Sequence, residues 1–407
     1  ISALNDEAIG VRINAARSLG RFGDEQAIEL LIGALKDNEP TARRTAADAL
    51  GKIGDEKALK PLVETLQDED VWVRRSAASA LRKLGNEQIV SLVLDALKRD
   101  RQWDRAEAAD VLGELVNENV AENLIGLMED EDAEIRRIAA GLLARLSDPR
   151  VLEPLVGALK DNSSAVRAEA ASALGTIADE RGVMPLIDAL KDSEPDVTVE
   201  IISSLGGIGD GRAVIPLIQV LKDRSGSVQI AAARALESIG DDRAVEPLIE
   251  VLEAEDVELR RVAASALGRF GDERAVDPLF VTAKDGERWV RKAAVEALGR
   301  LEAGDERIIG LMIEALEDPE TSVRCSAAEA LGRLGGTAAI DPLVKALEDE
   351  ESEVRGAAAL ALGKIGDSVT VQSLIGLLND SNDSVRTSAL LALSKIGEVE
   401  SVEPMIK

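Results

Sequence analysis

The chain has 407 residues and a net charge of −28, from 48 Lys plus Arg against 76 Asp plus Glu. This charge opposes general binding to nucleic-acid phosphates and to anionic membranes, and no apolar run reaches the roughly 18 residues of a membrane span. Histidine and tyrosine are absent and cysteine occurs once, which excludes imidazole catalysis, histidine metal sites and an internal disulfide framework.

A Val-Arg dipeptide, or a close variant of it, recurs along the chain and serves as the anchor of a repeat. Thirteen anchors are found, and successive anchors lie 31 residues apart except for one step of 33 residues, whose extra pair falls around 301–304. A period of this length predicts a solenoid of stacked units, none of which buries its apolar face alone. The anchor positions are Arg12, Arg43, Arg74, Arg105, Arg136, Arg167, Thr198, Gln229, Arg260, Arg291, Arg324, Arg355 and Arg386.

The first predicted element of each unit is an anchor helix. Apolar or small residues stand one position before the anchor and three, four and seven positions after it, as in Val73, Ala77, Ala78 and Leu81. This spacing is one face of a 3.6-residue period. A Leu-Gly pair often follows, and a second glycine three residues later is predicted to end the helix.

The second predicted element follows an Asp that is a good N-cap. Proline has a fixed place in it and is tolerated only in a first helical turn, so the stretch before the proline predicts a tight 3₁₀ turn. We expect helices of roughly 8 to 13 residues that depend on packing. The prolines are Pro61, Pro154, Pro185, Pro216, Pro247, Pro278, Pro342 and Pro404.

An aspartate stands six residues before most anchors. The order Pro-Leu, Leu-x-Asp, Val-Arg and Ala-Ala-x-Ala-Leu-Gly resembles the HEAT repeat, and the short period with Gly-Asp resembles its phycobilisome-lyase-like subtype. The resemblance implies an all-α, right-handed α-solenoid of about thirteen two-helix repeats, forming a single domain over 1–407. It also implies that the Asp braces a turn and the Arg bridges to acids of adjacent repeats. The aspartates are Asp6, Asp37, Asp68, Asp130, Asp161, Asp192, Asp223, Asp285, Asp318, Asp349 and Asp380.

Departures from the repeat supply the candidate binding residues. The fourth unit has an arginine in place of the expected Asp, and the three tryptophans all stand two residues before an anchor. Two of them are in neighbouring units, and Trp and Arg are enriched at interface hot spots. The alternative is a drifted repeat whose tryptophans pack over the next loop. The predicted partner-binding site is Trp72, Trp103, Arg44, Arg75, Arg99 and Arg101.

Units seven and eight lack the anchor arginine, having Thr198 and Gln229. Val199 and Ile230 follow them. These residues predict either an apolar strip on the surface or a bend in the solenoid; the alternative is a gap in the row of arginines that the fold tolerates. Positions one, two and five residues after each anchor are expected to line the inner face, where the residues vary along the chain.

No catalytic, cofactor-binding or metal-binding residue is identified, and Cys325, beside an anchor Arg, is expected to be buried. We therefore predict a non-enzymatic, cytoplasmic scaffold that binds proteins, with neither nucleic acid nor membrane as partner. A bilin-lyase-like or chaperone-like enzyme subunit and a structural spacer are the alternatives. Both ends cut a repeat in half, which predicts a fragment of a longer array or self-association through uncapped ends.

Overall fold

The computed structural model describes residues 2–22, 25–85, 89–93, 112–113, 120–224, 226–301 and 306–397. Across these ranges the regular structure is entirely helical, which confirms the all-α solenoid. The chain divides into two compact units, 1–204 and 205–407, and the boundary falls inside one helix. No helix in the described ranges combines the length and the apolar character needed to cross a membrane.

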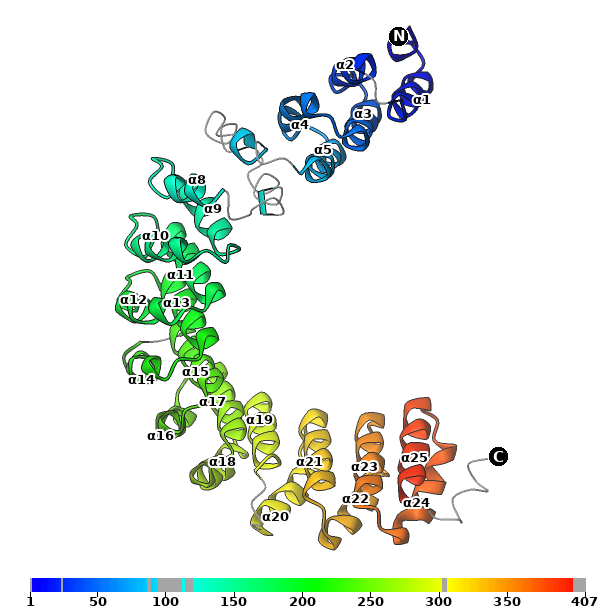
Figure 1. Cartoon of the computed structure of the whole chain (residues 1–407). Helices are drawn as coiled ribbons and strands as arrows, with labels where there is room; N and C mark the ends of the chain where they lie inside the picture. The colour runs from blue at the N-terminus through cyan, green and yellow to red at the C-terminus, as the bar shows by residue number, and fades with distance from the viewer. Residues whose placement is uncertain are drawn as a thin grey trace. The chain divides into compact units, whose positions relative to one another are not determined.

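Two kinds of helix alternate along the chain (Figure 1). Within the second unit, Figure 1 shows α21, α23 and α25 side by side, with α22 and α24 in a second layer beside them. The anchor helices are α1 (Ile9–Leu19), α3 (Pro40–Ile53), α5 (Val71–Leu84), α9 (Ala133–Leu143), α11 (Ser164–Ile177), α13 (Pro195–Ile208), α15 (Ser227–Ile239), α17 (Val257–Phe270), α19 (Arg288–Leu298), α21 (Thr321–Leu334), α23 (Ser352–Ile365) and α25 (Asp383–Ile396).

The second helices of the repeats form the other layer. They are α2 (Glu25–Ala34), α4 (Leu59–Thr65), α8 (Ala121–Leu127), α10 (Leu152–Ala158), α12 (Val183–Ala189), α14 (Val214–Asp223), α16 (Val245–Glu250), α18 (Val276–Thr282), α20 (Glu306–Ala315), α22 (Ile340–Ala346) and α24 (Val371–Gly376).

A short 3₁₀ turn precedes most second helices, as the fixed proline predicts. In the ninth repeat, the Asp272 side chain accepts a hydrogen bond from the Arg274 N–H, residues Glu273–Ala275 form the turn, and α18 begins two residues before Pro278. The capping Asp thus satisfies one of the N–H groups that the turn leaves without a backbone partner.

The two layers differ in helix length more than the sequence suggests. Anchor helices have 11 to 14 residues and second helices have 6 to 10, so the expected range of 8 to 13 is too narrow at both ends. The 3₁₀ turn takes residues from the second helix. Helices such as α3, α17 and α23 continue past the Leu-Gly pair to the second glycine, whereas α1 and α19 end at the pair. Gly366 ends α23 in the left-handed conformation at φ 77°.

The first glycine of the Leu-Gly pair sets how closely anchor helices approach. A Cβ built on Gly363 would lie 2.5 Å from the Cα of Ala392 on α25, and one on Gly332 would lie 2.7 Å from the Cα of Ala361 on α23. The backbones are therefore in near contact, which small side chains permit. This spacing explains why a core of Ala, Leu, Ile and Val needs almost no aromatic residues.

Candidate functional site

In the described residues, a buried ion pair joins most anchor arginines to the next repeat. The Nε and Nη2 atoms of Arg324 donate to both carboxylate oxygens of Asp349, each at 2.9 Å, and its Nη1 donates to the Asp318 carbonyl at 3.0 Å. Asp349 also accepts the Glu351 N–H at 2.9 Å. The Arg324 and Asp349 side chains are 9% and 14% exposed. One arginine therefore holds its own turn and the next turn together.

The same pair, named here a rung, recurs in both units. The Nε-to-carboxylate distances of the rungs lie between 2.5 and 2.9 Å. Each rung arginine is thus already paired with an aspartate of the chain, and we interpret the row of rungs as structural. The other rungs are Arg12–Asp37, Arg43–Asp68, Arg136–Asp161, Arg167–Asp192, Arg260–Asp285, Arg291–Asp318 and Arg355–Asp380.

In the two described repeats that lack the anchor arginine, a smaller polar side chain takes its position and donates a hydrogen bond to the backbone. Thr198 is fully buried and its hydroxyl donates to the Asp192 carbonyl at 3.3 Å, while the Gln229 amide donates to the Leu221 carbonyl at 2.8 Å. Val199 and Ile230 are half-buried. The local fold thus accommodates the missing rungs by satisfying the same backbone turn in another way.

Acid is expected to weaken the rungs and the capped turns. Hydrogen bonds from Arg136 hold the pKa of Asp161 below its ordinary value against the opposing effect of burial, and hydrogen bonds from Arg212 lower the pKa of Asp210 to about 2. Carboxyls with depressed folded-state pKa values stabilise the fold above the unfolded pKa of about 4, and that stability is lost as pH falls through the folded value. The urea midpoint followed by circular dichroism should hold near neutral pH and fall between about pH 4 and 2. A midpoint that does not change over that acid range would contradict this.

The described part of the predicted partner site lies at the start of α5. Trp72 is 56% exposed, and the guanidinium of Arg75 lies 5.2 Å from its ring centroid. Asp70 caps the helix by accepting the Trp72 and Val73 N–H groups, which fixes the tryptophan backbone. Arg44 is exposed at the position of α3 that Arg75 occupies on α5.

Trp103, Arg99 and Arg101 lie outside the described residues. The structure therefore brings Trp72 and Arg75 together and exposes Arg44, while the predicted proximity of the two tryptophans stays a prediction.

A second exposed tryptophan has the same register in the other unit. Trp289 is 47% exposed, and the Arg288 guanidinium lies 4.8 Å from its ring centroid. It borders a hollow of about 560 Å³ between α17 and α19, which Val257 also lines. The sequence favoured a site at the neighbouring pair of tryptophans over this isolated one, although all three stand two residues before an anchor.

The exposed positions of the anchor helices differ from the prediction in one respect. Residues one and five positions after the anchor are exposed or half-buried in most repeats, but Ile138, Val262 and Ala293, two positions after it, are buried. The reason is visible at Ser326, whose hydroxyl donates to Glu296 of the preceding anchor helix at 3.1 Å. In these repeats, the position two after the anchor thus faces the neighbouring helix, whereas in most other described repeats it is half-buried. We define the anchor-helix face as the positions two before, one after and five after each anchor.

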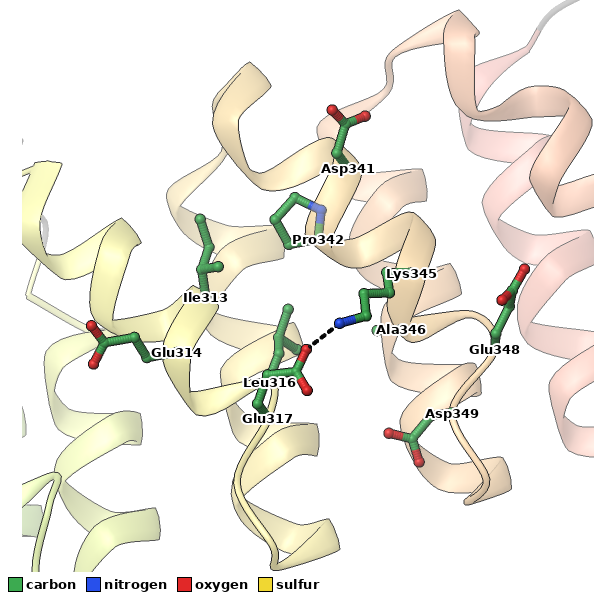
Figure 2. Close-up of a pocket in the computed structure, with 10 residues that line it drawn as sticks. All are labelled: Ile313, Glu314, Leu316, Glu317, Asp341, Pro342, Lys345, Ala346, Glu348 and Asp349. Atoms are coloured by element: carbon green, nitrogen blue, oxygen red, sulfur yellow. Dashed lines mark hydrogen bonds and ion pairs between the residues drawn. The ribbon is translucent and has the colours of Figure 1, made fainter.

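The second-helix layer has hollows of its own. One of about 670 Å³ lies between α20 and α22, where Lys345 and Glu317 form an ion pair at 2.7 Å (Figure 2). A hollow of about 360 Å³ between α2 and α4 is lined at equivalent positions, with Pro61 in the place of Pro342. The repetition shows that the seam between second helices creates these hollows, so they are no specialised site.

Metal ligands and nucleophiles are the possible sources of catalysis among the described residues. These residues contain no group of three or more His, Cys, Asp or Glu side chains placed to hold a metal ion. Cys325 is half-buried, and burial, followed by the charges of Glu329 and Glu353, raises the pKa of its thiol to about 11. The thiol is protonated at neutral pH and is a poor nucleophile.

Comparison with known proteins agrees with this architecture. The family of HEAT repeats matches the chain over residues 1–82, 40–113, 62–140, 90–175, 120–197, 183–257, 245–312 and 309–394. No curated protein matches the sequence. Yeast importin-β (Kap95p) is 15% identical over 97% of this chain and 67% of its own, with a TM-score of 0.63.

Two further solved structures have the same fold. Kap95p in a structure concerned with its binding to RanGDP is 16% identical, covers 100% of this chain and has a TM-score of 0.63, and the match spans 63% of Kap95p. Kap121p is 16% identical over 96% of this chain with a TM-score of 0.59, and the match spans 50% of Kap121p. At these identities the likeness shows the fold alone.

Proposed function

Because this chain belongs to the HEAT repeat family, we propose that it is a non-enzymatic scaffold that binds a protein partner on the anchor-helix face and its rim. The observation that carries the proposal is Trp72, an indole 56% exposed under the guanidinium of Arg75. A large aromatic ring held in place by a capped helix start and an arginine is the kind of anchor that dominates protein interfaces.

The contrast between constant buried positions and variable positions on the anchor-helix face supports this proposal. Rungs such as Arg43–Asp68 are nearly the same in every repeat that has them, whereas the residue one position after the anchor varies from an exposed Arg75 to a half-buried Cys325 to an exposed Thr387. A constant frame with a variable face is the arrangement that repeat proteins use for recognition. Kap95p, which shares the fold, binds a protein, RanGDP, and this is the same class of role.

Two other roles remain as alternatives to the scaffold. The phycobilisome-lyase-like subtype that the short repeat resembles would make the chain a bilin-lyase-like or chaperone-like enzyme subunit, with a bound pigment or a covalent product. A structural spacer would have no saturable partner. The scaffold is favoured because an exposed Trp beside an Arg is the kind of anchor that protein interfaces use, and no residue of the chain calls for either alternative.

A pair of tryptophan variants tests the scaffold. Affinity capture from native lysate with mass spectrometry identifies the partner, and titration calorimetry then measures its affinity for each variant. We expect Trp72→Ala to weaken binding about 30-fold, since a hot-spot residue contributes about 2 kcal/mol or more. Helicity should stay unchanged because the side chain is mostly in solvent.

Trp289→Ala is the matched control. Trp289 has the same register, a similar exposure of 47% and its own stacked arginine, but belongs to the other unit. Equal weakening by both variants would locate no site at Trp72, and the absence of any saturable partner would favour the spacer. A covalently attached pigment would favour the lyase.

A further inference from the structure

A hollow of about 410 Å³ lies on the anchor-helix face of α21, α23 and α25. Cys325 and Glu329 of α21 line it together with Glu353, Gly356 and Leu360 of α23. All three helices belong to the same compact unit and pack in sequence order. The hollow is therefore a feature of one compact stack of anchor helices.

Elsewhere on this face, a cation of the chain itself neutralises each comparable glutamate. Glu134 of α9 and Glu258 of α17 stand two residues before their anchors, and each pairs with the arginine three residues later, Arg137 at 2.7 Å and Arg261 at 2.6 Å. Glu296 of α19, five residues after its anchor, pairs with Lys292 at 3.7 Å. In all three a cation occupies the position one residue after the anchor, and Glu296 also pairs with Arg300 at 3.8 Å.

Glu353 and Glu329 keep the acid of this pattern and lack its cation. Glu353 also stands two residues before its anchor, but three residues later the chain has Gly356 in place of the arginine. Glu329 has the position of Glu296, and the residue four before it is Cys325 in place of the lysine. The two glutamates that lack this cation lie on adjacent helices, and both border the same hollow.

The described residues supply no substitute for these cations. Within the described ranges no ion pair is found for Glu329 or Glu353, and the Glu353 carboxylate accepts only the Ser352 hydroxyl, at 3.1 Å. Of the arginines on α21 and α23, Arg324 and Arg355 are each bound to both oxygens of a rung aspartate. Arg333, four residues after Glu329, donates instead to the Gly299 carbonyl at 3.5 Å. Burial raises the pKa of the Cys325 thiol first, and the charges of Glu329 and Glu353 raise it further, as expected of carboxylates that border the same hollow.

We propose that this hollow receives an Arg or Lys side chain from a basic segment of a protein partner, whose cation pairs with Glu329 and Glu353. The cation takes the place that Arg261 and Lys292 fill in the preceding repeats. Its aliphatic stem lies against Leu360, and Gly356 leaves the space it needs. The inference deepens the proposed scaffold function by naming the chemistry of the partner, and it rests on that function.

A short basic peptide tests the hollow without the native partner. The probe is a fluorescein-labelled tetra-arginine peptide, and its affinity is measured by fluorescence anisotropy at about physiological salt, where long-range attraction to the acidic chain is screened. We expect Glu329→Gln/Glu353→Gln to weaken binding about tenfold, since both carboxylates meet the bound guanidinium. Gly356→Arg, which supplies the missing cation from within the chain, should weaken it similarly. A Cβ at 356 meets the Ser388 Oγ at 3.4 Å, an ordinary contact, so this variant should fold.

The matched control is Glu258→Gln/Glu296→Gln, which changes the net charge equally at the equivalent positions but removes glutamates that are already paired. We expect it to change the affinity less than about twofold. Equal weakening by the two double variants would overturn the proposal, because the peptide would then sense only the overall charge. Failure of the scaffold function is separable from this result, since it appears as the absence of a Trp72-dependent partner and leaves the peptide affinities unchanged.

Discussion

Replacing Arg324 by alanine is expected to lower the free energy of unfolding by about 3 kcal/mol. The change leaves the Asp349 carboxylate, 14% exposed, without its cation and removes the donor to the Asp318 carbonyl. An unpaired buried charge costs more than the pair contributes, because its desolvation is no longer offset. The value lies at the low end of such losses because Asp349 keeps the Glu351 N–H. Urea unfolding followed by circular dichroism measures it.

Lys345→Ala is the control for this prediction. Its ion pair with Glu317 is as short, at 2.7 Å, but the two side chains are 74% and 67% exposed (Figure 2). Solvent and salt screen such a pair, so the midpoint should hardly move. If the two variants unfold at the same urea concentration, the buried rungs do not stabilise the stack as we infer.

Gly363→Val is expected to destabilise the second unit by about 3 kcal/mol. A Cβ at this position would lie 2.5 Å from the Cα of Ala392 and 2.7 Å from its Cβ, so the new side chain meets backbone that cannot rotate away. The anchor helices α23 and α25 would have to separate, and the leucines between them would lose contact. Urea unfolding measures the loss, and hydrogen exchange should show it concentrated in α25.

Gly310→Ala distinguishes this steric effect from a general effect of losing a glycine. Gly310 lies inside α20, and nothing stands within 4 Å of a Cβ built there. Alanine should therefore stabilise the chain by about 0.5–1 kcal/mol, because it restricts the unfolded backbone and favours the helix. Destabilisation by both substitutions would contradict close helix approach as the cause.

Much of the fold could be predicted because the repeat presents the same local physics many times. The fixed proline restricts where a helix can begin, and the preceding Asp, as at Asp272, caps a turn within four residues of itself. The second glycine, as at Gly366, ends a helix in the left-handed conformation. Helix lengths were less predictable, because the first glycine is tolerated inside the helix by contact with the next repeat, which no local pattern reveals.

In the candidate sites too, the sequence predicted the local position of a residue, and the structure was needed for its contacts. The register of Trp72, two residues before its anchor, predicted a place in the first turn of its helix, and it is exposed there. Its stacking with Arg75 needed the structure, although the spacing of three residues on a helix is compatible with it. The hollow beside Gly356 was not predicted, because it depends on comparing which glutamates of adjacent helices have a cation in reach.

The sequence by itself determined the helical class, the period, the caps and the rows of Arg and Asp, since each depends on residues within one 31-residue step. Only the tertiary structure decided which acid each arginine binds, as with Arg324 and Asp349, and in which repeats the position two after the anchor is buried, as at Val262. It also decided that Glu329 and Glu353 border one hollow without a cation of their own. These features arise between repeats, where the spacing of neighbouring helices determines which side chains meet.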